Sequence, residues 1–437
     1  MEFLLQSLNS HLVSVRDHLR GKLHDDLVSR LHNHDEGALP DMDLATIAAE
    51  SIDLLHSIEQ MLEPGQLVLA DHFLGERFIH TRKQPINIDQ GYVNAKCLCS
   101  AVELKIPEIL QEKGASTVEE LASLCGAHVD RLRQVLRILH NNGIFKYSPG
   151  KGCYENNSTS TLLLRDHWTQ WHNWIDLYGN QFYDMARGIP KSVQASENRS
   201  PAQVNFDTDM DMFNYFNKCG WVPQLHRTLG GGATAQGPGI IADYPWSEVA
   251  NETIIDIGGG SGALISLLLH THKTMQGGIY DLPHVIDHVT PFFHSPDGQF
   301  ADLADRVPRE NLIGGDFFKS IPPSKVYTMK WTLHNWKEAE ALKILRNIRQ
   351  SIIPSPKSRL VVMESILADG RSSRLSRYAD MNMFIAVNGL ERTATEWRNL
   401  AENSGWRIVR IIPLRNSWPA AIEMTPDVPR QNGWADS

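Results

Sequence analysis

A histidine and two glutamates fall at predicted strand ends in the C-terminal half of the chain. His334 directly follows the strand predicted from KVYTMKW, and Glu364 ends the next predicted strand, in RLVVMESIL. Glu391 stands in a loop before a helix whose start is marked by Thr393 and Glu396, a capping-box pair. An imidazole with a pKa near ~6.5 can accept a proton at neutral pH, and a carboxylate bonded to one ring nitrogen fixes its tautomer. The three residues could therefore serve as a general base with two orienting acids.

A second group of residues has the pattern of a site for an adenosine-containing ligand. One predicted strand ends at Asp256 and runs into the glycine turn GGGSG (258–262), where missing side chains let a ligand approach the main chain. Asp281 ends the next strand, where a carboxylate can accept both ribose hydroxyls, and Asp316 ends another beside Phe317, which could stack on adenine. The glycine spacing alone also fits a dinucleotide fingerprint, and the absence of GxxxxGK(S/T) disfavours a nucleoside triphosphate.

These residues require a fold that brings several strand ends to one edge. From Ile254 onward, apolar strands alternate with helical stretches, which predicts an α/β fold with a mainly parallel, doubly wound, Rossmann-like sheet. Open sheets of this kind bind ligands beyond the carboxyl ends of their strands. We therefore expect the glycine turn, the aspartates and the histidine to lie along one edge.

The region upstream has the order of a winged helix. Three predicted helices, the first over residues 93–104 and the second opened by a capping box at Thr117 and Glu120, precede short strands over 144–147 and 153–155. Winged helices can bind DNA, but the net charge of −9 and a predicted wing with only Lys151 disfavour phosphate binding. We interpret the region as an interface module, and a DNA-binding regulator remains an alternative.

Aromatic residues are dense between residues 165 and 235. Such density is typical of core packing and would also suit the walls of an apolar pocket for a flat substrate. By composition and position, the predicted pocket walls are Trp171, Trp174, Phe182, Met185 and Met381 or Met383. The stretch GGGATAQGPG (230–239) is predicted to be a flexible loop.

Six motifs occur in a recognisable order: DIGGGSG (256–262), YDLPHVI (280–286), GGDFF (314–318), KWTLHNW (330–336), VVMESIL (361–367) and GLERTATEW (389–397). The series resembles that of the plant caffeate/flavonoid-type and fungal secondary-metabolite O-methyltransferases, which are class I enzymes. The resemblance extends upstream to about Val93 and so covers most of the chain. It implies transfer of a methyl group from S-adenosylmethionine to a hydroxyl of a small, aromatic or phenolic acceptor, without a metal.

The resemblance also implies roles for single residues. In the family pattern, His334 matches the general base, and Glu364 and Glu391 match its flanking acids. The implied cofactor residues are Gly258 and Gly260 for the methionine part, Asp281 for the ribose, Asp316 and Phe317 for the adenine, and Lys330 beside the cofactor. Asn335 occupies a position where many plant members have an aspartate near the acceptor. The resemblance therefore does not predict that this chain uses the phenolic substrate of those plant enzymes.

Three regions are predicted: an N-terminal helical extension (1–85), a winged-helix-like dimerisation domain (86–165) and a catalytic methyltransferase domain (166–437). The first contains two apolar helical stripes with no core of their own to cover, which favours packing on a partner subunit or on the catalytic domain. The family resemblance implies a homodimer formed through these N-terminal helices.

Composition excludes several other classes of protein. No apolar run approaches the ~18–20 residues of a membrane span, and no signal peptide is recognisable. Five scattered cysteines without a CxxC pair favour neither a disulfide framework nor a zinc site. We expect a cytoplasmic protein with reduced thiols that binds neither nucleic acid nor membrane.

Two further alternatives concern the reaction. Some relatives use this scaffold for cyclisation, rearrangement or hydroxylation without net methylation, usually after the base motif has been lost. An NAD-linked reductase is disfavoured because no Tyr-x-x-x-Lys follows the fourth predicted strand.

Overall fold

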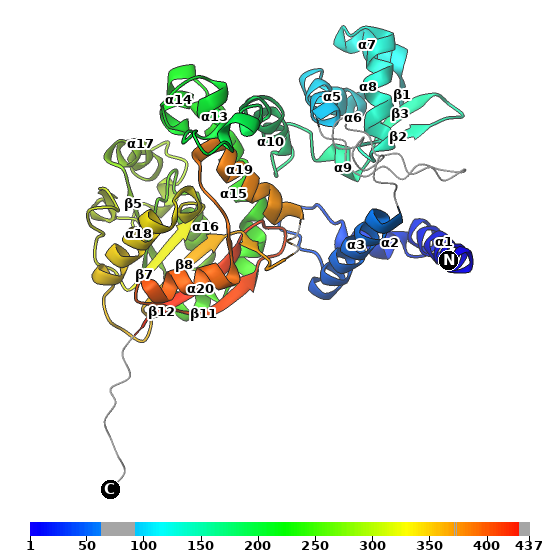
Figure 1. Cartoon of the computed structure of the whole chain (residues 1–437). Coiled ribbons are helices and arrows are strands. Elements are labelled where there is room, and N and C mark those ends of the chain that lie inside the picture. The colour runs from blue at the N-terminus through cyan, green and yellow to red at the C-terminus, as the bar shows by residue number, and fades with distance from the viewer. Residues whose placement is uncertain (63–91, 371, 373, 428–437) are drawn as a thin grey trace. The chain divides into compact units, whose positions relative to one another are not determined.

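The computed structural model describes residues 1–62, 92–370, 372 and 374–427 (Figure 1). The chain divides into two compact units, Met1–Trp168 and Thr169–Ser437, which are considered separately. Within the part of the chain that is described, no helix has the length and apolar character needed to cross a bilayer.

The first unit is mostly helical and matches the predicted order of elements closely. The capping box at Thr117 is present, and Gly126 ends α7 in the left-handed conformation. A helix that was not predicted, α6, starts at Ile106 with Pro107 in its first turn, where proline needs no hydrogen-bond partner. The elements are α1 (Glu2–Arg20), α2 (His24–Leu31), α3 (Met42–Leu62), α5 (Tyr92–Glu103), α6 (Ile106–Lys113), β1 (Ser116–Thr117), α7 (Val118–Cys125), α8 (Val129–Asn141), β2 (Phe145–Ser148), β3 (Cys153–Asn156) and α9 (Ser158–Thr161).

The N-terminal helices of this unit leave their apolar side chains uncovered. Neither α1 nor α2 contains a buried residue. Exposed apolar side chains include Phe3 and Leu4 on α1 and Ile52 and Leu54 on α3. The helices after residue 91 instead share a buried core around Leu121 and Leu136.

The second unit is built on a seven-stranded sheet of order β11-β12-β8-β7-β4-β5-β6. The five strands from β8 to β6 are parallel, while β12 runs antiparallel to both β8 and β11. The prediction of a mainly parallel, doubly wound α/β sheet is confirmed, with a mixed edge. The strands are β4 (Thr253–Ile257), β5 (Gln276–Asp281), β6 (Leu312–Gly314), β7 (Val326–Lys330), β8 (Arg359–Glu364), β11 (Trp406–Pro413) and β12 (Ala420–Pro426).

Helices cover both faces of this sheet. Consecutive strand residues face opposite sides, so Ile254 belongs to one buried core and Ile255 to the other. The helices α15 (Val222–Asp243), α16 (Ala263–Thr271) and α17 (Pro283–His294) pack over the first core. The helices α18 (Glu338–Ser351) and α20 (Ala394–Asn403) pack over the second (Figure 1).

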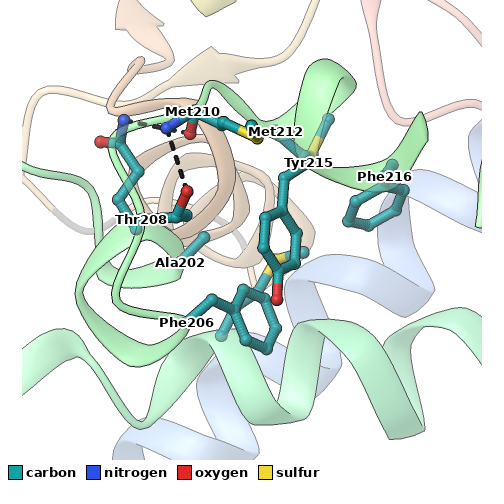
Figure 2. Close-up of a pocket in the computed structure, with 9 residues that line it drawn as sticks. Ala202, Phe206, Thr208, Met210, Met212, Tyr215 and Phe216 are labelled. Carbon is teal, nitrogen blue, oxygen red and sulfur yellow. Dashed lines mark hydrogen bonds between the residues drawn. The ribbon is translucent and has the colours of Figure 1, made fainter. Parts of the chain in front are cut away.

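A cluster of short helices joins α19 (Arg374–Val387) in a third buried core of this unit. It contains α10 (Trp171–Leu177), a π-helical turn (Tyr178–Phe182), α11 (Tyr183–Ala186), α12 (Ile189–Ser192), α13 (Pro201–Asn205) and α14 (Met212–Cys219). A pocket of about 10 Å³ lies in this cluster and leaves room for about one water molecule. Phe206 and Tyr215 lie on its wall (Figure 2). Of the predicted pocket walls, Met185 lines it, whereas Trp174 and Phe182 are buried in side-chain packing.

The predicted flexible loop over residues 230–239 is wrong, because the whole stretch lies inside α15. Its glycines permit close packing. A Cβ on Gly232 would lie 2.4 Å from the ring of Trp174, and one on Gly239 would lie 1.9 Å from the carbonyl oxygen of Arg415. The glycine-rich composition predicts flexibility. In the structure these positions instead require glycine because of tertiary contacts, which the local sequence does not reveal.

This packing predicts opposite effects for the same substitution at two positions of α15. Gly230→Ala adds a methyl group that meets nothing within 4 Å, so we expect it to raise the free energy of unfolding by up to about 1 kcal/mol through helix propensity. Gly232→Ala forces Trp174 to move, and we expect a loss of about 1–3 kcal/mol from overpacking. Urea unfolding of both variants measures the difference, and equal effects would contradict the close packing of α15.

Candidate active site

The residues that the sequence singles out lie at the carboxyl ends of the parallel strands. His334 sits in a short 3₁₀ turn (Leu333–Asn335) that follows β7, and Glu364 is the last residue of β8. Glu391 immediately precedes β10 (Arg392–Thr393), a two-residue strand that pairs in parallel with β9 (Ile366–Leu367). Three separate segments therefore meet at one edge of the sheet, as predicted.

The three side chains form a buried cluster. His334 Nδ1 lies 2.8 Å from Glu391 Oε1 and 3.1 Å from Glu364 Oε2, and the side-chain exposures are 8% for His334, 1% for Glu391 and 0% for Glu364. Because both neighbours of Nδ1 are carboxylates, this nitrogen carries the hydrogen and donates it to Glu391. The other ring nitrogen, Nε2, is then free to accept a proton.

Glu364 also fixes the backbone of the turn that carries His334. Its Oε1 accepts hydrogen bonds from the backbone N–H groups of Thr332, Leu333 and His334, at 2.9, 3.0 and 3.4 Å. A carboxylate held by several N–H groups is fixed in position and favoured in its charged form. Glu364 thus orients His334 both through the backbone and through the ring.

The charges in the cluster favour a protonated imidazole. Burial by itself would lower the pKa of His334, but the carboxylates of Glu364 and Glu391 outweigh it, and the net pKa is raised above its ordinary value. Burial also raises the pKa of the Glu364 carboxyl, against the opposing effect of His334. The cluster therefore stabilises the imidazolium that forms once His334 has accepted a proton.

The glycine turn after β4 forms an open cradle beside this cluster. Gly258 and Gly260 both adopt the left-handed conformation, with φ of +71° and +53°. A Cβ on Gly258 would lie 2.8 Å from Thr332 Oγ1, whereas the space around Gly260 is open to 4 Å. Asp281 Oδ2 accepts the Gly260 N–H at 2.9 Å, and its Oδ1 accepts the Leu282 N–H at 2.7 Å. The structure thus brings the predicted turn and the predicted ribose carboxylate into direct contact.

The remaining predicted cofactor residues lie on neighbouring strand ends. Lys330, the last residue of β7, is half-buried with its ammonium 3.5 Å from the ring centroid of Trp331, and the loss of water around the ammonium lowers its pKa to about 8. Asp316 follows β6, where its Oδ1 accepts the Phe318 N–H at 2.9 Å. Phe317 packs edge-on against Phe318 and Trp336. In the described part of the chain, no hydrogen bond or ring contact joins Asp316 or Phe317 to Asp281 or His334.

Two residues at this site were missed by the sequence interpretation. Asp380 on α19 accepts the backbone N–H of Glu391 at 2.9 Å, and Arg392 is fully buried beside the turn of His334. An acid inside the mainly apolar stretch ADMNMFIAV was the available signal for Asp380. Arg392 lies within a recognised motif, but its sequence context does not indicate which groups its side chain contacts.

Two family models match the chain. One describes an O-methyltransferase domain and matches residues 250–407, and the other describes an O-methyltransferase dimerisation domain and matches residues 87–166. Among curated proteins, the O-methyltransferase aclM of Aspergillus oryzae is 52% identical over 424 residues, which cover 97% of this chain and 94% of that protein.

Solved structures agree with these matches. The mitomycin 7-O-methyltransferase MmcR is 28% identical with a TM-score of 0.64, and the match covers 77% of this chain and 95% of that chain. CalO1, a methyltransferase in calicheamicin biosynthesis solved in its SAH-bound form, is 25% identical with a TM-score of 0.66 and the same coverage.

The geometry of the cluster predicts that metal removal has no effect on stability. His334, Glu364 and Glu391 offer ligand atoms within 4.8 Å of one another, a spacing that would fit a cation. However, Nδ1 is used as a donor to Glu391, and a metal ligand must be unprotonated. We expect dialysis against EDTA to leave the thermal unfolding midpoint unchanged. A lower midpoint that Zn²⁺ or Mg²⁺ restores would contradict this expectation.

Proposed function

The chain belongs to the O-methyltransferase family that carries an N-terminal dimerisation domain, and from this premise we propose that it methylates a phenolic hydroxyl of a small secondary metabolite with His334 as general base. The enzyme is an O-methyltransferase that uses S-adenosylmethionine as methyl donor. The observation that carries the proposal is the buried contact of His334 Nδ1 with Glu391 at 2.8 Å and Glu364 at 3.1 Å.

The residues around the glycine turn fit the cofactor. The open space at Gly260 lets a ligand approach the main chain, and Asp281 is fixed at its side by two backbone N–H groups. We propose that Gly258 and Gly260 hold the methionine part and Asp281 the ribose hydroxyls. Asp316 and Phe317 would hold the adenine, and Lys330 would lie beside the cofactor.

S-adenosylmethionine supplies a methyl group on a positively charged sulfur, which is open to attack by an oxygen nucleophile. A phenol with a pKa near ~10 is a weak nucleophile at neutral pH, so removing its proton speeds the reaction. His334 accepts that proton at Nε2, while Glu391 holds Nδ1–H and keeps the ring oriented. The two glutamates then stabilise the imidazolium. Orientation of the acceptor oxygen toward the methyl carbon contributes up to about 7–11 kcal/mol.

The class of acceptor rests on the relatives. The solved neighbours act in mitomycin and calicheamicin chemistry, which supports a secondary metabolite as acceptor here. Asn335, the residue after His334, offers a neutral amide where many plant members carry an aspartate, so we expect a different pattern of hydroxyl recognition.

We also propose an oligomeric state and a cellular compartment for the protein. The dimerisation domain and the uncovered apolar side chains of α1 and α3 support a homodimer. The five cysteines are all free thiols, which supports a reducing, cytosolic compartment.

The first experiment follows label from methyl-labelled S-adenosylmethionine onto a panel of phenols, with wild type and His334→Ala. We expect His334→Ala to lose at least about 100-fold in kcat while cofactor affinity holds, because only proton removal is lost. His270→Ala, on the exposed end of α16, is the control for loss of a histidine.

Other outcomes decide between the alternatives. Full activity of His334→Ala contradicts the assignment of the base. Conversion of an acceptor without formation of the demethylated cofactor favours a non-methylating reaction on the same scaffold. Failure to bind S-adenosylmethionine contradicts the proposed cofactor residues.

The pH dependence of the rate provides a second test. His334 must be unprotonated to act as a base, and its pKa is raised by Glu364 and Glu391. We therefore expect kcat/KM to rise with pH through a midpoint above the ordinary histidine value of ~6.5. Glu391→Gln removes one negative charge, so this midpoint moves to lower pH even as the plateau falls. A midpoint that stays in place or moves upward is the opposing result.

A further inference from the structure

Arg392 is a buried cation that the proposed mechanism does not use. Its side chain is 1% exposed, and its only acidic partner among the described residues is Glu338, a half-exposed residue 3.4 Å away. Burying a guanidinium is costly unless its donors are satisfied. The contacts that satisfy Arg392 therefore indicate what the residue does.

Within the described residues, two of its three side-chain hydrogen bonds are made to the backbone around His334. Arg392 Nη2 donates to the carbonyl of Trp336 at 2.8 Å, and Nη1 donates to the carbonyl of Leu333 at 3.5 Å. These two carbonyls stand immediately before and two residues after His334. The guanidinium also lies over the ring of Trp397, 5.6 Å from its centroid. The planar fork thus spans the turn that carries the base.

The backbone of Arg392 belongs to the segment that carries Glu391. Arg392 pairs with Ile366 in β10–β9, two residues beyond Glu364. In the same segment, the Leu390 N–H donates to the carbonyl of His334 at 2.9 Å, and a Cβ on Gly389 would lie 2.1 Å from that oxygen. The side chain and the main chain of one short segment therefore hold the turn of His334 together.

A second buried arginine shows what an ordinary ion pair looks like in this sheet. Arg359, at the opposite end of β8, contacts the carboxylates of Glu248 at 2.6 Å and Glu423 at 3.3 Å. Its charge is compensated by acids, and its contacts are remote from His334 in the chain. Arg392 differs because its shortest hydrogen bond goes to a backbone carbonyl of the active-site turn.

We propose that Arg392 is a positioning residue, which spans the carbonyls of Leu333 and Trp336 and so holds the turn of His334 against the segment of Glu391. The inference rests on the proposed role of His334 as base. Arg392 touches neither ring nitrogen of His334 nor the cofactor cradle at Gly260 and Asp281. Its loss should therefore lower kcat and leave KM for the cofactor nearly unchanged.

The test is a double-mutant cycle of Arg392→Met and Glu391→Ala in the full-length enzyme. In the wild-type background we expect Arg392→Met to lower kcat by about 10- to 100-fold, because a displacement near 1 Å has effects of this size. In the Glu391→Ala background, the contact that Arg392 maintains is already lost, so the same substitution should cost less than about 3-fold. Equal losses in both backgrounds would overturn the proposal.

Two further variants separate positioning from stability. Arg359→Met removes a buried arginine of the same unit, and we expect it to lower the unfolding midpoint without moving the pH–rate profile. Arg392→Met should move the rise of kcat/KM to lower pH, as Glu391→Gln does. A profile that stays in place would overturn the proposal.

Arg392→Lys keeps the charge and can reach only one of the two carbonyls. We expect it to recover part of the activity lost in Arg392→Met. Where Arg392→Met yields no folded protein, the cycle is run with Arg392→Lys.

Full activity of His334→Ala would contradict the proposed function itself. An impaired His334→Ala together with a fully active Arg392→Met would overturn the positioning role alone.

Discussion

The hydrogen bond between His334 Nδ1 and Glu391 Oε1 is the contact on which the site depends, and it joins segments 57 residues apart. Neither segment belongs to a long helix or strand, so neither is rigid by itself. The turn of His334 is tied down by the Glu364 carboxylate through three backbone N–H groups. The segment of Glu391 is tied down by Asp380 through one backbone N–H. The position of the imidazole is thus determined by carboxylates on β8 and α19 as much as by its own strand.

Burial strengthens the electrostatic effect of the charged side chains at this site, and it also makes their charged forms energetically costly. Asp256 accepts the Thr328 hydroxyl at 2.8 Å, and burial raises its pKa to about 7. Lys330, at the next strand end, is attracted to both Asp256 and Glu364. Charges of alternating sign on neighbouring strand ends compensate one another where water is excluded, and the same exclusion strengthens their action on a reacting group. One sheet edge therefore supplies both the stability and the electrostatics of the site.

The sequence was sufficient to predict those features that depend on chain order and local pattern. Strand ends at Asp281, Lys330 and Glu364 follow from apolar runs, and parallel strands bring their carboxyl ends together by topology. The glycines of α15 were misread because close packing against Trp174 involves a residue 58 positions upstream of Gly232. Arg392 and Asp380 were missed for a related reason, since their contacts at this site are with backbone groups that no side-chain motif marks. Contacts between a side chain and a main-chain group far away in the sequence could not be predicted from the sequence pattern.

Backbone strain at the site supports the view that its geometry is imposed by its surroundings. Trp331 and Asn388 both adopt the left-handed conformation, with φ of +53° and +56°, and each stands three residues before its active-site acid or base. For residues other than glycine this conformation costs about 1–2 kcal/mol, and asparagine tolerates it better than tryptophan does. Such strain persists only where neighbouring contacts determine the backbone. Here those contacts are the N–H groups bound by Glu364 and the Leu390 N–H bound by the carbonyl of His334.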